Sequence, residues 1–487
     1  MTKNAASSSS VPLSTDRRRW LARSGASLAG ALGVGTLGNL VLGARQAHAA
    51  DYKALVCIFL YGGNDGLNTI VPTDTARYTQ YAAVRKGLAV PQASLTPLAG
   101  SSFGLHPSLA ALKSAWDEGH LAPVFNLGPL NRPLTKQQFH DAPNASALIP
   151  DSLFSHADQQ TLWETGTSSS LTRTGWGGRA STALNTANPV ISVSGATRFG
   201  QTSLQSALVL PSTPGEVFGA YGLQPADLTW APQKARKAAL DALYAQAQEV
   251  ALGDAFNTAQ RNAFLVSDRL AGLVKIVPKG DGANAVIDAA FAPLIGTDNK
   301  VTTRLGQQLY QVAKLVYGNA TVQGSRQVFF ANMGGFDTHA DQAVTGSITE
   351  GAHARLLKEL GDALACFTAA MKNLGLGNAV TAFTQSDFGR TFLPNQSNGT
   401  DHGWGNQHLV VGGAVKGGTY GTYPELTLGG VNDIGVESWE LQGRWLPTTS
   451  VDQYAATLLN WFGASDAQLG QILPNLANYT TRKLGFV

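Results

Sequence analysis

Apolar residues gather in five short runs, each followed by a turn that contains glycine. The runs are continuous rather than alternating with polar positions, and they span Ala54–Leu60, Leu121–Leu127, Val328–Asn332, Ala379–Thr384 and His408–Val411. Continuous runs rich in β-branched and aromatic residues predict strands that are covered on both faces, as in a parallel sheet between two layers of helices.

Helical spacing separates these runs. The clearest apolar stripe recurs every three or four residues and comprises Leu356, Leu357, Leu360, Leu364, Phe367, Met371 and Leu374. Shorter stripes lie at Leu109–Trp116 and Tyr454–Phe462. Because strands alternate with helices, the pattern predicts an α/β fold with a doubly wound, mostly parallel sheet.

One long segment departs from this alternation. Residues from about 201 to 299 are rich in alanine and glutamine, with a helical pattern near Lys234–Lys275. We interpret this segment as a mostly helical insertion, and we expect it to cap the sheet beside the functional site.

The positive charge of the chain lies in its first 49 residues. The formal net charge is +3 over 487 residues, yet six basic residues oppose one acidic residue in residues 1–49, so the rest carries a slight excess of acid. This distribution excludes a basic, nucleic-acid-binding body. The strand ends also lack the glycine patterns of phosphate-binding and dinucleotide-binding loops.

The same N-terminal residues have the features of an export signal. Arg17-Arg18-Arg19-Trp20-Leu21 precedes a glycine-rich apolar stretch, and Ala47-His48-Ala49 fits a signal-peptidase site. The paired arginines resemble a twin-arginine (Tat) signal, with a Sec peptide or an N-terminal anchor as the alternatives. We therefore expect residues 1–49 to be removed and residues 50–487 to form a periplasmic or secreted domain without a membrane span.

Side chains that bind metals follow the predicted strands. Asp65, Asp337 and Asp387 each come after an apolar run, with His339 close to Asp337 and His402 in a later turn. Ligands of an open parallel sheet collect at the carboxyl ends of its strands. Mixed carboxylate and imidazole groups there predict one or two divalent cations, namely Zn²⁺, Mn²⁺ or Ca²⁺. The alternative is that each aspartate only stabilises a turn.

Four further residues have both a functional and a structural interpretation. Ser155 begins a predicted helix, either as a nucleophile or as the cap of a Ser-x-x-Asp box. His156 either ligates a metal, protonates a leaving group or is exposed. His353 faces the sheet either as a buried core histidine or as a metal ligand. Arg390 pairs either with a substrate oxyanion or with Asp387.

Four motifs together resemble a known bacterial family. They are Leu60-Tyr61-Gly62-Gly63-Asn64-Asp65-Gly66-Leu67-Asn68, Gly335-Phe336-Asp337-Thr338-His339, Ser386-Asp387-Phe388-Gly389-Arg390-Thr391 and Asp401-His402-Gly403-Trp404-Gly405. Over nearly all of the mature chain, the sequence is similar to domain-of-unknown-function family 1501, placed in the alkaline-phosphatase-like superfamily with the sulfatases. The resemblance implies an alkaline-phosphatase-like fold with a two-metal site and a Ser or Thr nucleophile at the start of a helix.

The resemblance also implies roles for individual residues. Asp65 and Asp387 match the ligands of one metal, whereas Asp337, His339 and His402 match those of the other. Two features depart from the superfamily pattern: Asp387 is followed by Phe388 instead of histidine, and the Asp-to-His spacing is shorter. These departures imply that one metal site is weakened, replaced or absent.

Two functions of different classes follow. The first is an exported, metal-dependent hydrolase of a phosphate or sulfate ester, with Ser155 as nucleophile and a small anionic ester or glycan-type molecule as substrate. The second is a non-catalytic exported protein that keeps the fold and binds a glycan, a polymer or a partner protein. The Asp/His constellation favours the first function, and the missing histidine after Asp387 favours the second.

Overall fold

The computed structural model describes residues 51–142, 147–344, 346–431, 433–435 and 442–487. The export signal expected in residues 1–49 lies outside the described residues and stays a prediction. Within the described ranges, no helix combines the length and apolar character needed to cross a membrane.

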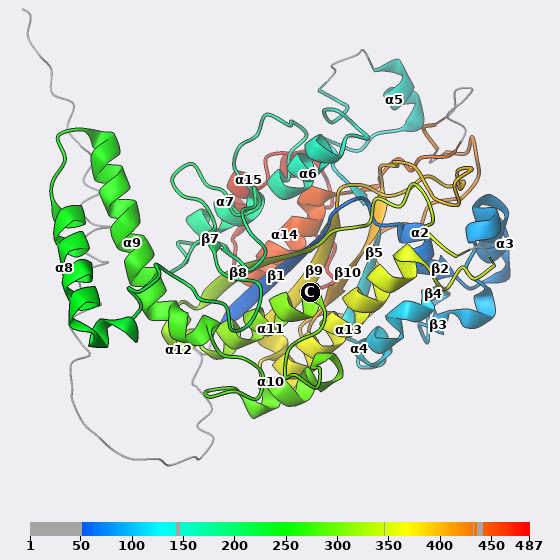
Figure 1. The fold of residues 1–487 in the computed structure, drawn as a ribbon. Coiled ribbons are helices and arrows are strands. Elements are labelled where there is room, and N and C mark those ends of the chain that lie inside the picture. The colour runs from blue at the N-terminus through cyan, green and yellow to red at the C-terminus, as the bar shows by residue number, and fades with distance from the viewer. Residues whose placement is uncertain (1–50, 143–146, 345, 432, 436–441) are drawn as a thin grey trace, which may run out of the picture. The chain divides into compact units, whose positions relative to one another are not determined.

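The main sheet has eight strands in the order β11-β5-β10-β9-β1-β8-β6-β7 (Figure 1). Its five longer strands coincide with the five apolar runs: β1 (Lys53–Leu60), β5 (Leu121–Gly128), β8 (Arg326–Met333), β9 (Val380–Ser386) and β10 (Asn406–Val411). The short strands are β6 (Ile191–Ser192), β7 (Leu208–Val209) and β11 (Thr449–Ser450). All neighbours pair in parallel except β10, which runs antiparallel to both β9 and β5. The predicted mostly parallel α/β sheet is confirmed.

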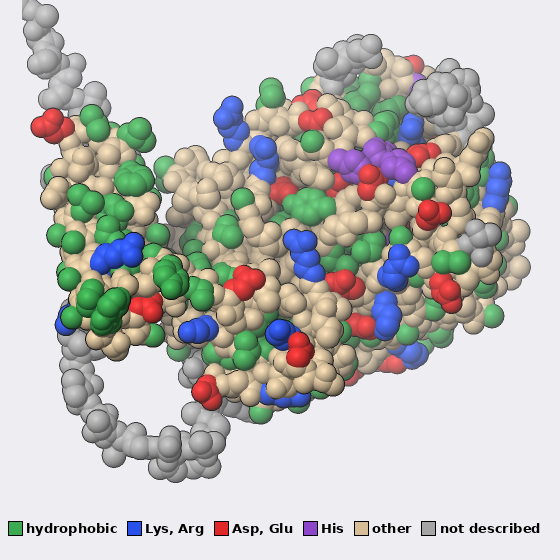
Figure 2. All heavy atoms as spheres, viewed as in Figure 1, with side chains coloured by type: hydrophobic (Ala, Val, Ile, Leu, Met, Phe, Trp, Pro, Cys, Tyr) green, Lys and Arg blue, Asp and Glu red, His purple; other side chains and the backbone are tan. Residues whose placement is uncertain are grey.

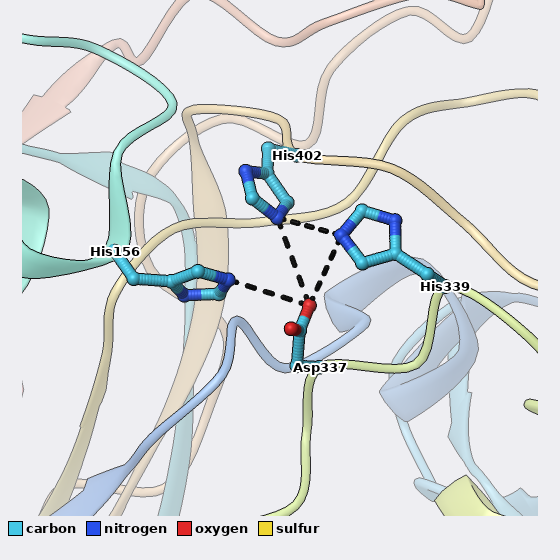
Figure 3. Close-up of side chains that lie close together, drawn as sticks. All are labelled: His156, Asp337, His339 and His402. Carbon is cyan, nitrogen blue, oxygen red and sulfur yellow. Dashed lines mark hydrogen bonds and ion pairs between the residues drawn. The ribbon is translucent and has the colours of Figure 1, made fainter.

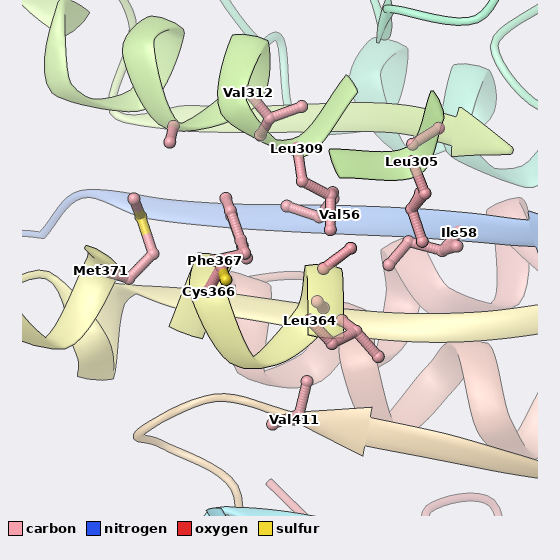
Figure 4. Packing of buried hydrophobic residues seen from close by; sticks show 14 of the residues in the cluster. Val56, Ile58, Leu305, Leu309, Val312, Leu364, Cys366, Phe367, Met371 and Val411 are labelled. Carbon is pink, nitrogen blue, oxygen red and sulfur yellow. The ribbon is translucent and has the colours of Figure 1, made fainter. Parts of the chain in front are cut away.

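Helices cover both faces of this sheet, as a doubly wound fold requires. Alternate residues of β1 enter two different cores, because successive side chains of a strand point to opposite faces. Val56 and Ile58 pack with Leu309 of α11 (Arg304–Tyr317) and Leu364 of α13 (Ala352–Asn373) (Figure 4). Leu55, Cys57 and Phe59 point to the other face. They pack with α6 (His156–Thr165), α7 (Trp176–Ala183), α14 (Val451–Phe462) and α15 (Asp466–Ile472).

Smaller elements complete the described chain. A second sheet orders its strands β2-β4-β3, with β2 at Ile70–Pro72, β4 at Phe103–Leu105 and β3 at Thr96–Pro97. The remaining α-helices outside residues 201–299 in the described chain are α2 (Gly66–Thr69), α3 (Thr75–Arg85), α4 (Lys113–Asp117), α5 (Lys136–Asp141) and α12 (Asn319–Val322).

The segment of residues 201–299 is mostly helical but also adds the edge strand β7 to the main sheet. It contains α8 (Ala231–Ala245), α9 (Ala251–Val274) and α10 (Ala285–Ala290). The C-terminal end of α9 is held by Lys314 of α11, whose Nζ donates to the carbonyls of Leu273 and Val274 at 3.1 and 3.0 Å. Because α11 leads through α12 into the amino end of β8, this contact lies at the amino edge of the sheet. The contact places this end of α9 away from the predicted ligands, and the expected cap beside the functional site stays a prediction.

A close backbone approach shapes the opposite, carboxyl edge. Gly62 follows β1 with φ +115°, and a Cβ atom there would lie 2.4 Å from the backbone nitrogen of Asp337, which follows β8. Only glycine accommodates both the conformation and the contact. The loops after β1 and β8 therefore touch directly. Since β10 runs antiparallel, the turn that contains His402 before β10 also lies at this edge.

Candidate metal centre

Four side chains from three separate segments converge at the carboxyl edge. His156 is the first residue of α6, Asp337 and His339 follow β8, and His402 precedes β10. One ligand atom of each residue lies within 4.8 Å of the others (Figure 3). The Nε2 atoms of His156, His339 and His402 lie 3.3, 3.2 and 3.6 Å from Asp337 Oδ1.

Each of the three histidines is fixed by a hydrogen bond on the far side of its ring. The Nδ1 atoms each lie 2.7 Å from an oxygen acceptor: Asp387 Oδ2 for His156, Asp401 Oδ1 for His339 and the Phe154 carbonyl for His402. A carboxylate or carbonyl only accepts, so each Nδ1 carries the proton. In the neutral form of each ring, Nε2 then presents its lone pair to the cluster, as in the ligand-orienting arrangement of metalloproteins.

The resulting geometry fits a cation. The Nε2 atoms of His339 and His402 lie 2.7 Å apart with their lone pairs directed at each other, which is repulsive unless a positive charge lies beside both. The Nε2 atom of His156 is buried and has no hydrogen-bond partner among the described residues. Three imidazole nitrogens and one carboxylate oxygen can together ligate a divalent metal.

The electrostatics of the cluster keep Asp337 and His402 in their ligating forms, whereas the hydrogen bond with Asp387 raises the pKa of His156 above its ordinary value. Burial raises the pKa of Asp337, but the Arg390 guanidinium and two histidines outweigh burial and hold that pKa below its ordinary value. Burial lowers the pKa of His402 to about 4. At neutral pH the carboxyl group of Asp337 is therefore charged and the His402 ring is neutral, which metal ligation requires.

The loop that leads to His156 is strained. Phe154 has φ 72° and Ser152 has φ 46°, in a left-handed region that bulky side chains rarely adopt. The strained Phe154 residue is the one whose carbonyl accepts from His402. Such outliers concentrate at functional sites because the surrounding structure must hold them.

The family of the chain is shown by its sequence. The family described as "Protein of unknown function (DUF1501)" matches residues 52–453. The chain belongs to the DUF1501 family. The match extends from the start of β1 into α14 and includes all four residues of the cluster.

Other comparisons with the DUF1501 chain are weak. No curated protein matches it. Among solved structures, the PsFucS1 sulfatase from Pseudoalteromonas sp. is 11% identical, with 83% of the DUF1501 chain and 71% of the sulfatase covered at a TM-score of 0.31. At this score the likeness carries no information about the chemistry of the site, and the alkaline-phosphatase-like superfamily stays a prediction.

Asp65 of the DUF1501 chain lies outside the cluster, which corrects its expected role as a ligand. Its Oδ2 accepts from Arg85 and, at 2.5 Å, from Gln342 Nε2. Its Oδ1 accepts from the backbone nitrogens of Leu67 and Asn68 as the N-cap of α2. Both carboxylate oxygens are therefore engaged in a buried ion pair and a helix cap.

Asp387 lies behind the cluster instead of in it, which also corrects an expected ligand. Its Oδ2 accepts from His156 Nδ1 and from Gln160 Nε2 at 2.9 Å, and its Oδ1 accepts from the Gly62 backbone nitrogen at 3.1 Å. Asp387 thus orients a ligand. Phe388, which follows Asp387, has its ring centroid 4.8 Å from that of His156.

Arg390 is also engaged within the protein. Its guanidinium is buried and donates to Asp337 Oδ1 at 2.8 Å and to the carbonyls of Gly62, Gly63, Phe336 and Thr400. It therefore holds Asp337 and the surrounding loops. The sequence suggested that Arg390 pairs with a substrate oxyanion or with Asp387. The structure corrects both interpretations, because the guanidinium is bonded to Asp337 and to backbone carbonyls.

Ser155 lies directly before the ligand His156. It is the N-cap of α6, but its side chain makes no capping hydrogen bond in the described structure. The capping box predicted as one alternative for Ser155 is thus not formed. Sequence reasoning left three alternatives open for the neighbouring His156 and did not place it in the ligand set, because only the packing of α6 against the sheet edge brings it there.

His353 is a buried core histidine, which corrects its expected place among the ligands. Its Nε2 lies 3.0 Å from Asn64 Oδ1, and its ring forms a T-shaped pair with the His106 ring, with centroids 6.2 Å apart. Burial lowers the pKa of His353 to about 4 and that of His106 to about 3. Both rings are neutral in the folded protein at neutral pH.

The buried histidines predict a loss of stability in acid. A ring with a folded pKa of about 4 and an unfolded pKa of ~6.5 binds fewer protons when folded, so stability falls as the pH drops through this window and levels off below it. For His353 the loss amounts to about 3 kcal/mol. We expect His353→Gln to reduce the difference in unfolding free energy between pH 7 and pH 4.5.

Urea unfolding of the metal-free protein measures this effect. His140→Gln, at an exposed position of α5, is the matched control and should leave the pH dependence unchanged. Equal pH dependences for wild type and His353→Gln would contradict the assignment.

Proposed function

We propose that the chain is a metal-dependent hydrolase of a phosphate or sulfate ester, with one divalent cation held by His156, Asp337, His339 and His402. The observation that carries this proposal is the convergence of three oriented Nε2 atoms on one carboxylate oxygen. This donor set suits Zn²⁺ or Mn²⁺. Ca²⁺ does not suit three imidazoles, because it prefers oxygen ligands.

The engaged side chains support one ion instead of two. Asp65 is paired with Arg85, and Asp387 is occupied by His156, Gln160 and a backbone nitrogen. The resemblance implies these two aspartates as ligands of a further metal. With both engaged elsewhere, the proposed centre is mononuclear.

The charges of the site support an anionic substrate only when the metal is bound. Three carboxylates, those of Asp337, Asp387 and Asp401, face two guanidinium groups, those of Arg390 and Arg444, the latter donating to the His402 carbonyl. This leaves one net negative charge, which a divalent cation reverses.

The cluster is also accessible. The side chains of Asp337 and His339 are 47% and 43% exposed, and a patch of histidines reaches the molecular surface (Figure 2). A substrate can therefore approach the ligands from solvent.

Ser155 is the proposed nucleophile because it adjoins a ligand at a helix start. A helix N-terminus stabilises negative charge, both on an ionising hydroxyl and on a bound phosphate or sulfate. The bound cation supplies further positive charge and lowers the pKa of a nearby hydroxyl. Ser155 Oγ bonds to phosphorus or sulfur, the ester bond breaks, and the hydroxyl proton leaves with the alcohol. Water then cleaves the seryl ester and restores Ser155.

A second candidate function keeps the metal but not the chemistry. Arg390, for which contact with a substrate oxyanion was one of two sequence-based alternatives, is bonded to protein oxygens instead. This observation favours a non-catalytic protein that binds an anionic ligand through its metal. Such a protein would contain the metal without turnover.

Ser155→Ala tests the proposed function. We expect the variant to keep one metal per chain. Its turnover of 4-nitrophenyl sulfate or phosphate should fall by more than about a hundredfold, because only the attacking oxygen is removed. Elemental analysis and 4-nitrophenol release measure the two quantities. Removing the metal by chelation should abolish turnover in the wild type, and adding Zn²⁺ or Mn²⁺ should restore it.

The matched control is Ser465→Ala, at the capping box of α15. It should cost about 1 kcal/mol of stability as a lost N-cap and leave turnover unchanged. Full turnover in Ser155→Ala would exclude Ser155 as nucleophile. A wild type that binds metal and hydrolyses neither ester would support the second function.

A further inference from the structure

Asp65 and Arg85 form a buried ion pair that the proposed reaction does not use. Both side chains are 0% exposed. Arg85, the last residue of α3, also donates to the carbonyls of Thr391 and Phe392 at 2.9 and 3.2 Å. The pair therefore joins α3, which carries Arg85, to the loop that follows β9.

Gln342 links this ion pair to two other segments. Its Nε2 donates to Asp65 Oδ2 at 2.5 Å, and its Oε1 accepts from Thr338 Oγ1 at 3.0 Å and from Thr400 Oγ1 at 2.6 Å. All four of these side chains are buried. The amide is suited to this position because it offers a donor to a carboxylate and two lone pairs to hydroxyl groups.

The two threonines are interleaved with the residues of the metal centre. Thr338 lies between Asp337 and His339, and Thr400 directly precedes Asp401 and His402. The Thr400 backbone nitrogen donates to the Thr338 carbonyl at 3.0 Å, so the two segments also contact each other directly. Buried threonines thus alternate with residues that face the cluster.

We propose that Gln342 is a positioning residue for the metal centre, tying the two ligand-bearing segments to the Asp65–Arg85 ion pair. This inference rests on the metal site of the proposed function. In this proposal Asp65, in the Gly-Gly-Asn-Asp-Gly turn, also helps to position the metal ligands without binding the metal itself. Partners behind metal ligands commonly change metal affinity 10–100-fold.

Three variants test this role through the affinity for Zn²⁺, measured by competition with a chromophoric chelator. Gln342→Met removes both sets of hydrogen bonds at similar length, and we expect Zn²⁺ to bind about 10–100-fold more weakly. Gln342→Glu places a carboxylate against Asp65 and should weaken binding at least as much. The double variant Gln342→Glu, Asp65→Asn exchanges the carboxylate and amide partners and should recover part of the affinity. Recovery should be incomplete, because Asp65 Oδ2 accepts from Arg85 as well as from Gln342.

Thr338→Val and Thr400→Val provide a second route should the Gln342 variants fail to fold. Each keeps the side-chain volume and removes one hydroxyl, and each should weaken Zn²⁺ binding. Thr368→Val is the matched control, because this hydroxyl bonds only to the backbone of its own helix α13. The unfolding free energy of the metal-free variants separates positioning from general stability.

The outcomes distinguish the two proposals. Wild-type Zn²⁺ affinity, within twofold, in folded Gln342→Met and in both threonine variants would overturn the positioning role while leaving the metal site intact. A wild type that binds no Zn²⁺ or Mn²⁺ would overturn the metal site and the positioning role with it. A wild type that binds metal without turnover would remove the hydrolase function only, since the affinities still test Gln342.

Discussion

Replacing His339 with alanine is expected to remove the metal from the purified protein and to abolish turnover. His339 contributes one of the three converging Nε2 atoms, and its loss leaves Asp337 and two imidazoles. Loss of a direct ligand should exceed the 10–100-fold effect of a partner behind a ligand. Asp401→Asn changes a residue behind the ligand, whose Oδ1 accepts from His339 Nδ1 and from Asn395 Nδ2, and it should therefore weaken Zn²⁺ binding less than His339→Ala does.

The same substitution should have an opposite effect on the metal-free protein. With both rings neutral and no cation beside them, the Nε2 lone pairs of His339 and His402 repel each other at 2.7 Å. His339→Ala removes this repulsion, so the metal-free variant should unfold at equal or higher urea concentration than metal-free wild type. With Zn²⁺ present the order should reverse, because only the wild type gains binding energy.

Elemental analysis and urea unfolding with and without Zn²⁺ measure this reversal. His140→Ala, which removes an exposed histidine of α5, should change neither quantity. Full metal content in His339→Ala would exclude the proposed ligand set.

Arg85→Met is expected to be the most destabilising single change considered. It leaves the Asp65 carboxylate buried without its cation, which typically costs about 3–5 kcal/mol. Asp65→Asn should cost less, because Arg85 keeps three other acceptors, namely Asn68 Oδ1 and the carbonyls of Thr391 and Phe392. The double variant Arg85→Met, Asp65→Leu should recover part of the loss, since no unpaired charge remains.

Urea unfolding at neutral pH measures these differences. Lys358→Met, which breaks the exposed pair with Asp362 on α13, is the control and should cost less than about 0.5 kcal/mol. An Arg85→Met variant as stable as the control would show that the buried pair contributes nothing.

The strands could be predicted from the sequence, but their directions could not. A continuous apolar run indicates that both faces of a strand are covered, and all five runs form strands of the main sheet. The run at His408–Val411 has the same continuous apolar pattern as the other four, yet β10 is antiparallel to its neighbours. Direction depends on which edge the connecting loop returns to, and hydrophobic patterning does not encode it.

Some of the proposed ligands could likewise be predicted from local sequence, whereas others depend on tertiary packing. Asp337, His339 and His402 were predictable because each lies in a turn next to a strand end. The position of His156 depends on how α6 packs against the sheet edge. Asp65 resembles a ligand in its turn, and only its contacts with Arg85 and Gln342 reveal that both oxygens are engaged. A sequence motif identifies the kind of side chain but not its partner.

The distribution of the ligands along the chain has a consequence for folding kinetics. In sequence, 248 residues separate Phe154 from His402, whose hydrogen bond helps to form the cluster. The centre therefore depends on contacts of very long range, which form late because closing such loops costs entropy before the contacts compensate for it. A cation that binds only the completed centre stabilises the native state and not the transition state that precedes it. It consequently slows unfolding and leaves the folding rate unchanged.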